Sequence, residues 1–344
     1  MKTLNADAWR DALSSRVLLF GATLCACFLY LVIRTPYSFF EPGFFAEDGT
    51  NYFTDIANNG FLNALFQTHQ GYFVFGTLTL SGLSFVVDRV FLGNDVRQMP
   101  FAMALVSGIY FALLASLPIL LLRKRLSNVW LVCLATFIVA TPLGDGDNAI
   151  IGRLSNVGYS CVYLAVILIL YRIDLKPSGV RLFLCDLCLF VCANTNPVVY
   201  LLVPLAALPY LSGWNDWRRL LKNQSFLSFL TLLAGLAAVA AHLAALKPYG
   251  TRDHLGGSFV WKNAVEMLLA REFLYPLLFP VYAYLKDGFV ILLTVVIVAS
   301  IVWLIRRQTW EKNQFYLVVI VGFSIFAIAS AVFRPGLSTA FQSY

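Results

Sequence analysis

Charged residues are scarce in this chain of 344 residues, because Lys, Arg, Asp and Glu make up only 12% of it while hydrophobic residues make up 60%. A soluble domain carries about 25% charged residues, so the composition excludes an ordinary soluble fold. The apolar residues are spread over many runs, which is typical of a protein that crosses a membrane several times. We therefore expect an all-α polytopic integral membrane bundle, with residues 1–344 forming a single membrane domain.

Several motifs that define other protein classes are also missing. The chain has no Gly-rich phosphate-binding loop, no Ser nucleophile elbow and no zinc-ligand spacing, so nucleotide-driven transport is unsupported. Its seven cysteines all lie within apolar runs and do not form a disulfide framework. Cys185, Cys188 and Cys192 have the spacing of one helix face, which leaves a metal site and simple packing as alternatives. Packing is favoured because no His accompanies them.

The apolar runs that are long enough, or nearly long enough, to cross a bilayer are 16–34, 101–122, 128–143, 156–172, 181–196, 198–212, 225–246, 288–305 and 314–333. A spanning helix needs about 20 residues, so we expect about nine to ten spans, some of them short or re-entrant. The run between 181 and 212 is interrupted by Asn194-Thr195-Asn196-Pro197. Because lipid cannot satisfy freed backbone groups, this break must face protein or water.

Basic residues predict the orientation of the spans. The clusters between spans include Lys2, Arg10 and Arg16, then Arg123-Lys124-Arg125, then Arg172, Lys176 and Arg181, then Arg218, Arg219 and Lys222, then Arg306 and Arg307. With the spans given above, all of these fall on the side of the N-terminus. Cytoplasmic loops carry the excess of Lys and Arg, so the N-terminus is expected in the cytoplasm. The two long loops, 35–100 and 247–287, then lie on the outer side and carry short interfacial helices.

One apolar segment does not fit this count. Residues 72–92 could span, but a crossing there would invert every later loop and place Arg123-Lys124-Arg125 outside. We therefore expect this segment to lie at the outer surface or to pack without crossing. Asp88 and Arg89, near its end, fit a position at the membrane interface.

An acidic pair marks the start of the first outer loop. Residues 44–49 read Phe-Phe-Ala-Glu-Asp-Gly, and no basic residue is close in sequence to Glu47 or Asp48. Two adjacent carboxylates near a bilayer surface suggest a functional role. The structural alternative is the start of a helix, where acidic residues are favoured and Gly49 permits a turn.

The layout resembles the GT-C class of membrane glycosyltransferases, which use lipid-linked sugars. Members of that class have a cytoplasmic N-terminus, one span and then a long outer loop with an acidic motif near its start. The chain is also similar to a set of bacterial membrane proteins in which Ala-Glu-Asp-Gly is followed by Gly-Tyr, here residues 46–49 and 71–72. The resemblance covers most of the chain as topology, but only residues 46–72 as motif.

The resemblance implies a reaction and its partners. Asp48 or Glu47 would deprotonate an acceptor hydroxyl, which attacks the sugar carried by a polyprenyl phosphate. The partners are then membrane lipid, a polyprenyl-phosphate sugar donor and a glycan acceptor such as O-antigen, with no nucleic acid. The setting would be the periplasmic face of a bacterial inner membrane. Some relatives use a divalent cation, so Mg²⁺ or Mn²⁺ held by carboxylates stays open as a cofactor, although no metal ligand is assigned.

A lipid-phosphate site also needs cations, and the guanidinium fork of Arg suits phosphate. The candidates on the outer side are Arg153, Arg252, Lys262, Arg271 and Arg334. The alternative for each of them is interfacial snorkelling or pairing with a nearby acid. Tyr72 and His69 complete the candidate substrate-binding set, and His69 fits an ordinary polar loop residue equally well.

Two other functions stay open. A transporter or flippase of lipid-linked saccharide predicts charged residues buried along a path, and Asp186 is the only acid within a predicted span. Its place near the cytoplasmic end argues against that function. A polysaccharide polymerase of the O-antigen type shares the lipid and the acceptor. It needs basic residues in its outer loops, which Arg252 and Arg271 supply.

Overall fold

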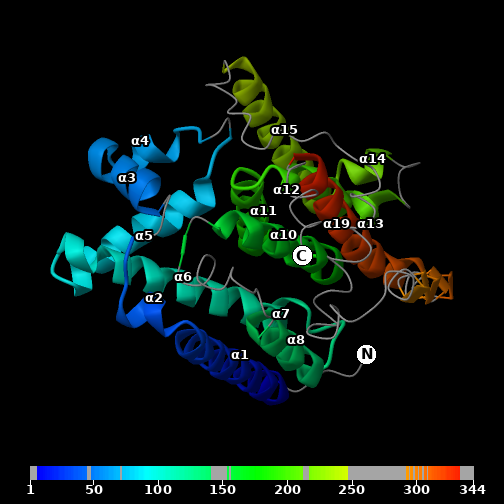
Figure 1. The fold of residues 1–344 in the computed structure, drawn as a ribbon. Helices are drawn as coiled ribbons and strands as arrows, with labels where there is room; N and C mark the ends of the chain where they lie inside the picture. Colours follow the sequence, from blue (N-terminus) through cyan, green and yellow to red (C-terminus); the bar gives the residue numbers. More distant parts are fainter. Residues whose placement is uncertain are drawn as a thin grey trace.

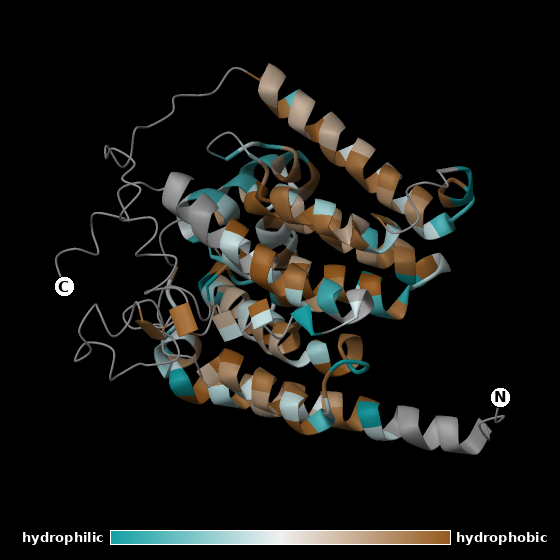
Figure 2. Ribbon diagram, turned by 90° about the vertical axis from the view of Figure 1, so that its right-hand side faces the viewer, coloured by the Kyte–Doolittle hydropathy of each residue, from teal (hydrophilic) through white to brown (hydrophobic). Residues whose placement is uncertain are grey.

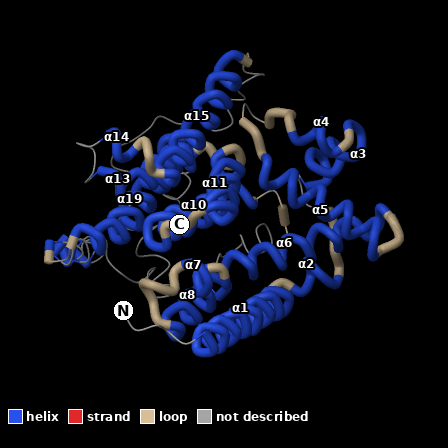
Figure 3. Tube along the Cα trace, turned by 180° about the vertical axis from the view of Figure 1, so that it is seen from behind, coloured by secondary structure: helices blue, strands red, loops and turns tan. Residues whose placement is uncertain are grey.

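The computed structural model describes residues 6–44, 48–69, 72–140, 153–154, 156–211, 217–246 and 309–333, with short pieces between 292 and 307. Within these ranges all regular elements are helices (Figure 3). Extended backbone pairs there in one isolated bridge, between His69 and Tyr72. The predicted all-α class is confirmed.

Four helices are long and apolar enough to cross a membrane, and they cover Ser15–Arg34, Val96–Leu121, Val157–Leu175 and Gln224–Ala245. Shorter apolar helices cover Asn128–Ala140, Val198–Leu211 and Asn313–Gly322. Hydrophobic residues dominate the long helices on the outside as well as the inside of the bundle (Figure 2). The chain is therefore a helical membrane protein. The predicted run 288–305 lies mostly outside the described residues.

The helices form a bundle around α10 (Val157–Leu175). On one side lie α1 (Ala6–Arg34), α6 (Met99–Ser116), α7 (Pro118–Leu121) and α8 (Asn128–Ala140) (Figure 1). On the other side lie α11 (Gly179–Ala193), α12 (Val198–Leu202), α13 (Leu208–Leu211), α14 (Trp217–Leu220), α15 (Gln224–Ala245) and α19 (Trp310–Phe333). The largest group of buried apolar residues joins α6, α10, α11, α12, α15 and α19.

The segment between α1 and α6 returns to the end of the bundle from which it left. Helix α1 packs on α7, whereas the following α2 (Pro36–Phe40) packs on α6, where Phe39 lies against Gly108. The two chain directions are therefore antiparallel. We call the end where α1 finishes and α10 begins the first-loop end, and the opposite end the amino-terminal end. Residues 35–98 start and finish at the first-loop end, as the sequence predicted for a segment without a net crossing.

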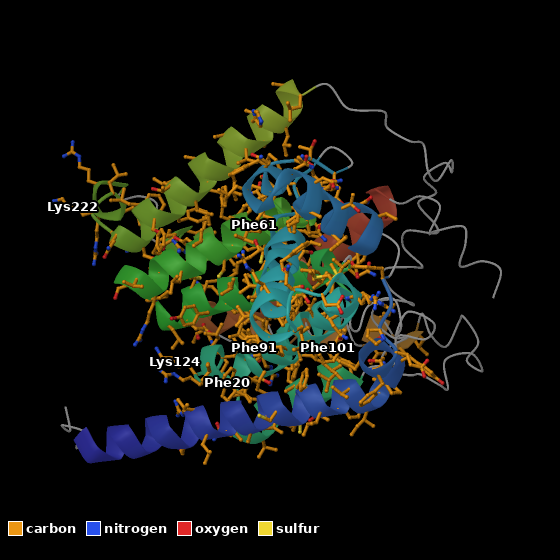
Figure 4. All side chains as sticks on the ribbon, turned by 90° about the vertical axis from the view of Figure 1, so that its left-hand side faces the viewer. Phe20, Phe61, Phe91, Phe101, Lys124 and Lys222 are labelled. Atoms are coloured by element: carbon orange, nitrogen blue, oxygen red, sulfur yellow. The ribbon has the colours of Figure 1, made fainter. Side chains whose placement is uncertain are left out.

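The basic clusters that the structure describes gather at the amino-terminal end. Lys124 and Lys222 both lie on the side where α1 begins (Figure 4). Arg125 forms a two-pronged ion pair with Asp174 at the end of α10, with Nε–Oδ2 and Nη2–Oδ1 distances of 2.9 and 2.6 Å. The same guanidinium lies over the ring of Phe315 near the start of α19. The basic residues therefore lie at one end of the bundle, as the sequence predicts. The cytoplasmic location of that end stays a prediction.

Arg172 departs from the sequence interpretation. It was grouped with the basic loop residues, but its side chain is buried inside the bundle. Arg172 Nη1 donates to Asp186, and Nη2 donates to the carbonyl of Ser225. Ser228 donates to the other carboxylate oxygen of Asp186. One buried ion pair therefore ties α10 to α11 and α15.

The first two residues of the break after α11 are enclosed by protein, whereas Pro197 is exposed. Asn194 and Thr195 are both buried. Helix α5 (Phe75–Phe91) begins against this break, where the backbone N–H of Phe75 donates to the carbonyl of Asn194 over 3.2 Å. The N–H of Gly76 donates to Thr195 Oγ1 over 2.7 Å. The first free donors of α5 thus meet the acceptors that the break leaves free, so each end satisfies the other.

Helix α5 turns its polar face inward. Its buried polar side chains, which we call the α5 polar stripe, are Thr77, Ser81, Ser84 and Asp88. Its exposed large apolar side chains are Leu83, Val86, Val90 and Phe91. This arrangement suits a helix whose outer face meets lipid rather than water. Arg89 is exposed, whereas Asp88 is only 3% exposed and therefore faces protein. The interfacial position of this helix end stays a prediction.

Candidate functional site

Asp48 lies in a buried position at the first-loop end. It begins a short π-helix, η1 (Asp48–Phe53), and is 2% exposed. Its Oδ2 accepts a hydrogen bond of 3.1 Å from the backbone N–H of Leu154, a fully buried residue just before α10. Thr54, the residue that follows η1, donates from its Oγ1 to the carbonyl of Gly49 over 2.8 Å. Single π turns are often found at functional sites.

Arg153 holds the same loop from its other side. Its Nη1 donates to the carbonyl of Gly43 over 2.6 Å, and its own carbonyl accepts a 3.0 Å hydrogen bond from Ser107 on α6. Partial burial lowers the pKa of Arg153, and the negative charge of Asp48 opposes that shift. The two side chains therefore attract each other across the contact between the first loop and residues 153–154.

The local sequence explains why η1 sits where it does. A Cβ added at Gly49 would lie 2.8 Å from Cβ of Phe44, so only glycine permits this approach. The ring of Phe44 packs on Phe53 at a centroid distance of 5.0 Å, and Phe53 in turn stacks on Phe85 of α5 at 5.4 Å. The alternative role of the acidic pair as a helix start also holds for Asp48, since it is the first residue of η1.

His69 and Tyr72 lie beside the helix that Asp48 begins. Their backbones exchange two hydrogen bonds of 2.8 and 3.1 Å. The His69 ring meets the ring of Tyr52, on η1, edge to face at 5.5 Å. His69 Nε2 lies 3.4 Å from Oδ2 of Asp55 in α3 (Thr54–Asn59). The sequence analysis did not single out Asp55. Its place in the first turn of a helix, where acidic residues are favoured, could have marked it as a partner for His69.

The structure thus places only some of the predicted site residues. The charges of Asp48 and Arg153 are close enough to interact, and His69 and Tyr72 adjoin the same helix. The others lie outside the described residues, namely Glu47, Arg252, Lys262, Arg271 and Arg334. The backbone N–H of Leu154 and the hydroxyl of Ser107 are site groups that the sequence did not single out.

The metal-site alternatives concern the carboxylate of Asp48 and the cysteines of α11. Within them, no group of three or more His, Cys, Asp and Glu side chains could hold a metal ion. A divalent ion at Asp48 would take its remaining ligands from water, from a bound phosphate or from residues that are not described. Cys185 and Cys192 are buried whereas Cys188 is exposed, so the three cysteines do not converge on one point.

No family model, curated protein or solved structure matches this chain. The candidate site is defined by its own geometry. It consists of a buried carboxylate, a partly buried guanidinium and an aromatic and histidine cluster, all brought together by the first loop at one end of a membrane bundle.

Proposed function

We propose that this membrane protein transfers a sugar from a polyprenyl-phosphate donor to a surface glycan such as O-antigen, at the periplasmic face of a bacterial inner membrane. The observation that carries the proposal is the buried Asp48 carboxylate, held by the Leu154 N–H and attracted by Arg153. A fixed carboxylate and a fixed guanidinium at one end of a bundle are the two charges that such a transfer needs.

The proposed reaction has one chemical step. The oxygen of the acceptor hydroxyl attacks the anomeric carbon, and its proton passes to the carboxylate of Asp48 or Glu47. The bond from the anomeric carbon to the lipid phosphate oxygen breaks, and the phosphate keeps the electron pair. Arg153 would stabilise the negative charge that develops on that phosphate. Because the charge grows during the step, the stabilisation is greatest in the transition state.

The proposed orientation places the first-loop end in the periplasm and the N-terminus in the cytoplasm. Its support is the location of Lys124, Arg125 and Lys222 at the amino-terminal end, away from Asp48. Lys and Arg are enriched in cytoplasmic loops, so that end is the cytoplasmic one. Polyprenyl-phosphate donors carry their sugar at the membrane surface, where the first loop would meet it.

The test compares Asp48→Asn with the wild-type protein in a transfer assay that uses a synthetic polyprenyl-phosphate sugar and purified glycan acceptor. The amide oxygen of Asn can still accept the Leu154 N–H, but it cannot take up the proton. We expect transfer to fall by about 10²–10⁴-fold, with the melting temperature close to that of the wild type. Asp95→Asn, at an exposed cap where Asn serves equally well, is the matched control. Unchanged transfer in both Asp48→Asn and Glu47→Gln would contradict the proposal.

A transporter of lipid-linked saccharide is the second candidate, and buried charge favours it. The sequence indicated only Asp186 inside a span, whereas the structure buries Asp88 and Arg172 as well. Intramembrane ionisable residues often mark a transport path. In vesicles, the transporter would move a fluorescent lipid-linked saccharide between leaflets without any acceptor glycan. The transferase would instead consume the donor only when the acceptor is present.

A further inference from the structure

The α5 polar stripe contains two buried polar atoms without partners. Its members Thr77, Ser81, Ser84 and Asp88 are spaced by four, three and four residues, so they form one line along the helix. All four are at most 3% exposed. Neither Asp88 Oδ1 nor Ser81 Oγ is accessible or hydrogen-bonded. Buried polar atoms are almost always satisfied in proteins, so each exception calls for an explanation.

Asp88 differs in this respect from Asp174 and Asp186. Asp174 pairs with Arg125, and Asp186 pairs with Arg172. Asp88 has no ion-pair partner in the described ranges, and its sequence neighbour Arg89 is exposed. A buried carboxylate without a partner is strongly unfavourable when ionised, because it loses its hydration without replacement. A cation bound from solution would supply the partner that the described residues do not.

The end of α5 favours a cation for a second reason. Asp88 stands in the last turn of the helix, where backbone carbonyls accumulate partial negative charge. Its own carbonyl already accepts from the N–H groups of Leu92 and Asn94. That carbonyl is therefore not free as a ligand, but the helix end still places negative potential beside the carboxylate. Helix C-terminal ends recur at the cation sites of membrane proteins.

The ligand set indicates which cation fits. It contains one carboxylate and, one helical turn earlier, the hydroxyl of Ser84, which donates to the carbonyl of Leu80 and keeps its lone pairs for a metal ion. All of these donors are hard oxygens, and Mg²⁺ and Ca²⁺ sites use such donors with more charge. A single carboxylate neutralises one positive charge, so the ligand set suits a monovalent cation.

We propose that Asp88 and Ser84 form a binding site for a sodium ion between α5 and its neighbours. The site is separate from Asp48 and does not depend on the proposed transfer reaction. Its two residues stand on either side, in sequence, of Phe85, the residue on which Phe53 of η1 stacks. Ser81 and Thr77 continue the polar line towards Gly76, where α5 meets the break at Thr195.

The test uses the full-length protein in nanodiscs, at fixed pH and ionic strength, with NaCl exchanged for KCl or choline chloride. A ligand that binds only the folded state raises the melting temperature, and tenfold excess over the dissociation constant gives about 2–4 °C. We expect a saturable rise of this size with Na⁺ in the wild type. We also expect no such rise in Asp88→Asn, and a shift to higher Na⁺ concentration in Ser84→Ala. Asp95→Asn should respond as the wild type does.

Two outcomes would overturn the site. One is a melting temperature that is the same in sodium, potassium and choline salts. If that temperature changes only with pH, a proton and not a sodium ion neutralises Asp88. The other is a sodium response that persists in Asp88→Asn. If that variant does not fold, calorimetric titration of the wild type and Ser84→Ala with NaCl decides the question. Heat of binding in the wild type, with weaker binding in Ser84→Ala, supports the site, and no heat in either rejects it.

Discussion

Asp48 and Leu154 are joined by a hydrogen bond between the Oδ2 carboxylate oxygen and the backbone N–H, across 106 residues of sequence. Both groups are buried, so the bond lies in a medium where an unpaired donor or acceptor is unfavourable. It fixes the start of η1 against the start of α10. The acidic motif is therefore a structural tie as well as the proposed base, and the two roles can be separated by mutation.

Asp48→Ala should destabilise the protein more than Asp48→Asn. Alanine leaves the Leu154 N–H buried without an acceptor, which lowers the free energy of unfolding by about 1–3 kcal/mol. Asparagine retains an acceptor oxygen at nearly the same place. Melting temperatures of the two purified variants in nanodiscs measure the difference. Equal melting temperatures would mean that the bond contributes nothing to stability.

Gly76→Ala should disturb the contact between α5 and the break after α11. A Cβ at Gly76 would lie 2.8 Å from Thr195 Oγ1 and 3.2 Å from Thr195 Cγ2. We expect a fall in melting temperature, which Thr195→Ala in the same protein partly reverses because it removes both crowded atoms. Gly21→Ala is the control, since nothing lies within 4 Å of its Cβ position on α1. There the higher helix propensity of Ala should leave stability unchanged or raised. Independent effects of Gly76→Ala and Thr195→Ala would contradict the contact.

Arg172 and Asp186 should show strong coupling in a double-mutant cycle. Removing one partner of a buried ion pair leaves an uncompensated charge and lowers the free energy of unfolding by about 3–5 kcal/mol. We expect Arg172→Met and Asp186→Leu each to show such a loss, and the double variant to lose much less than their sum. Arg125→Met with Asp174→Leu is a second cycle at a pair nearer the helix ends. Additive losses at Arg172 and Asp186 would rule out the coupling.

The orientation of the chain can be measured by thiol labelling in intact cells, in a version without the seven native cysteines. Asn59→Cys lies in the first loop, and Asn128→Cys lies at the start of α8 at the amino-terminal end. Both positions are exposed. An impermeant reagent should label Asn59→Cys and not Asn128→Cys. The reverse result would place the N-terminus outside the cell.

Hydropathy and basic residues predicted the fold class, the break after α11 and the return of residues 35–98 to one end. These features depend on the chemical character of whole segments. The burial of Asp88 could not be predicted in this way. The spacing of apolar residues along a helix does not show which face of that helix packs against protein. In water the apolar face of α5 would point inward, but in a bilayer that face meets lipid and the polar face is buried.

The site was predictable only where one segment carries the signal. Residues 46–49 identified Asp48, but its partner Leu154 contributes a backbone N–H, which no residue type reveals. The pair of Arg172 and Asp186 was missed for a related reason. Arg172 stands next to basic loop residues in sequence, and its burial depends on the way α11 and α15 close over it.

The contacts of α5 have a consequence for the order in which the protein is made. The hydrogen bond from the Gly76 N–H to Thr195 cannot form until Thr195 has been synthesised, 119 residues after Gly76. At about 5–20 residues per second, the interval is roughly 6–24 s. During that time the first loop has already been made, while its binding partner is still being synthesised. Assembly of this end of the protein is therefore a late event, set by insertion of α10 and α11, and the loop is open to proteases or chaperones until then.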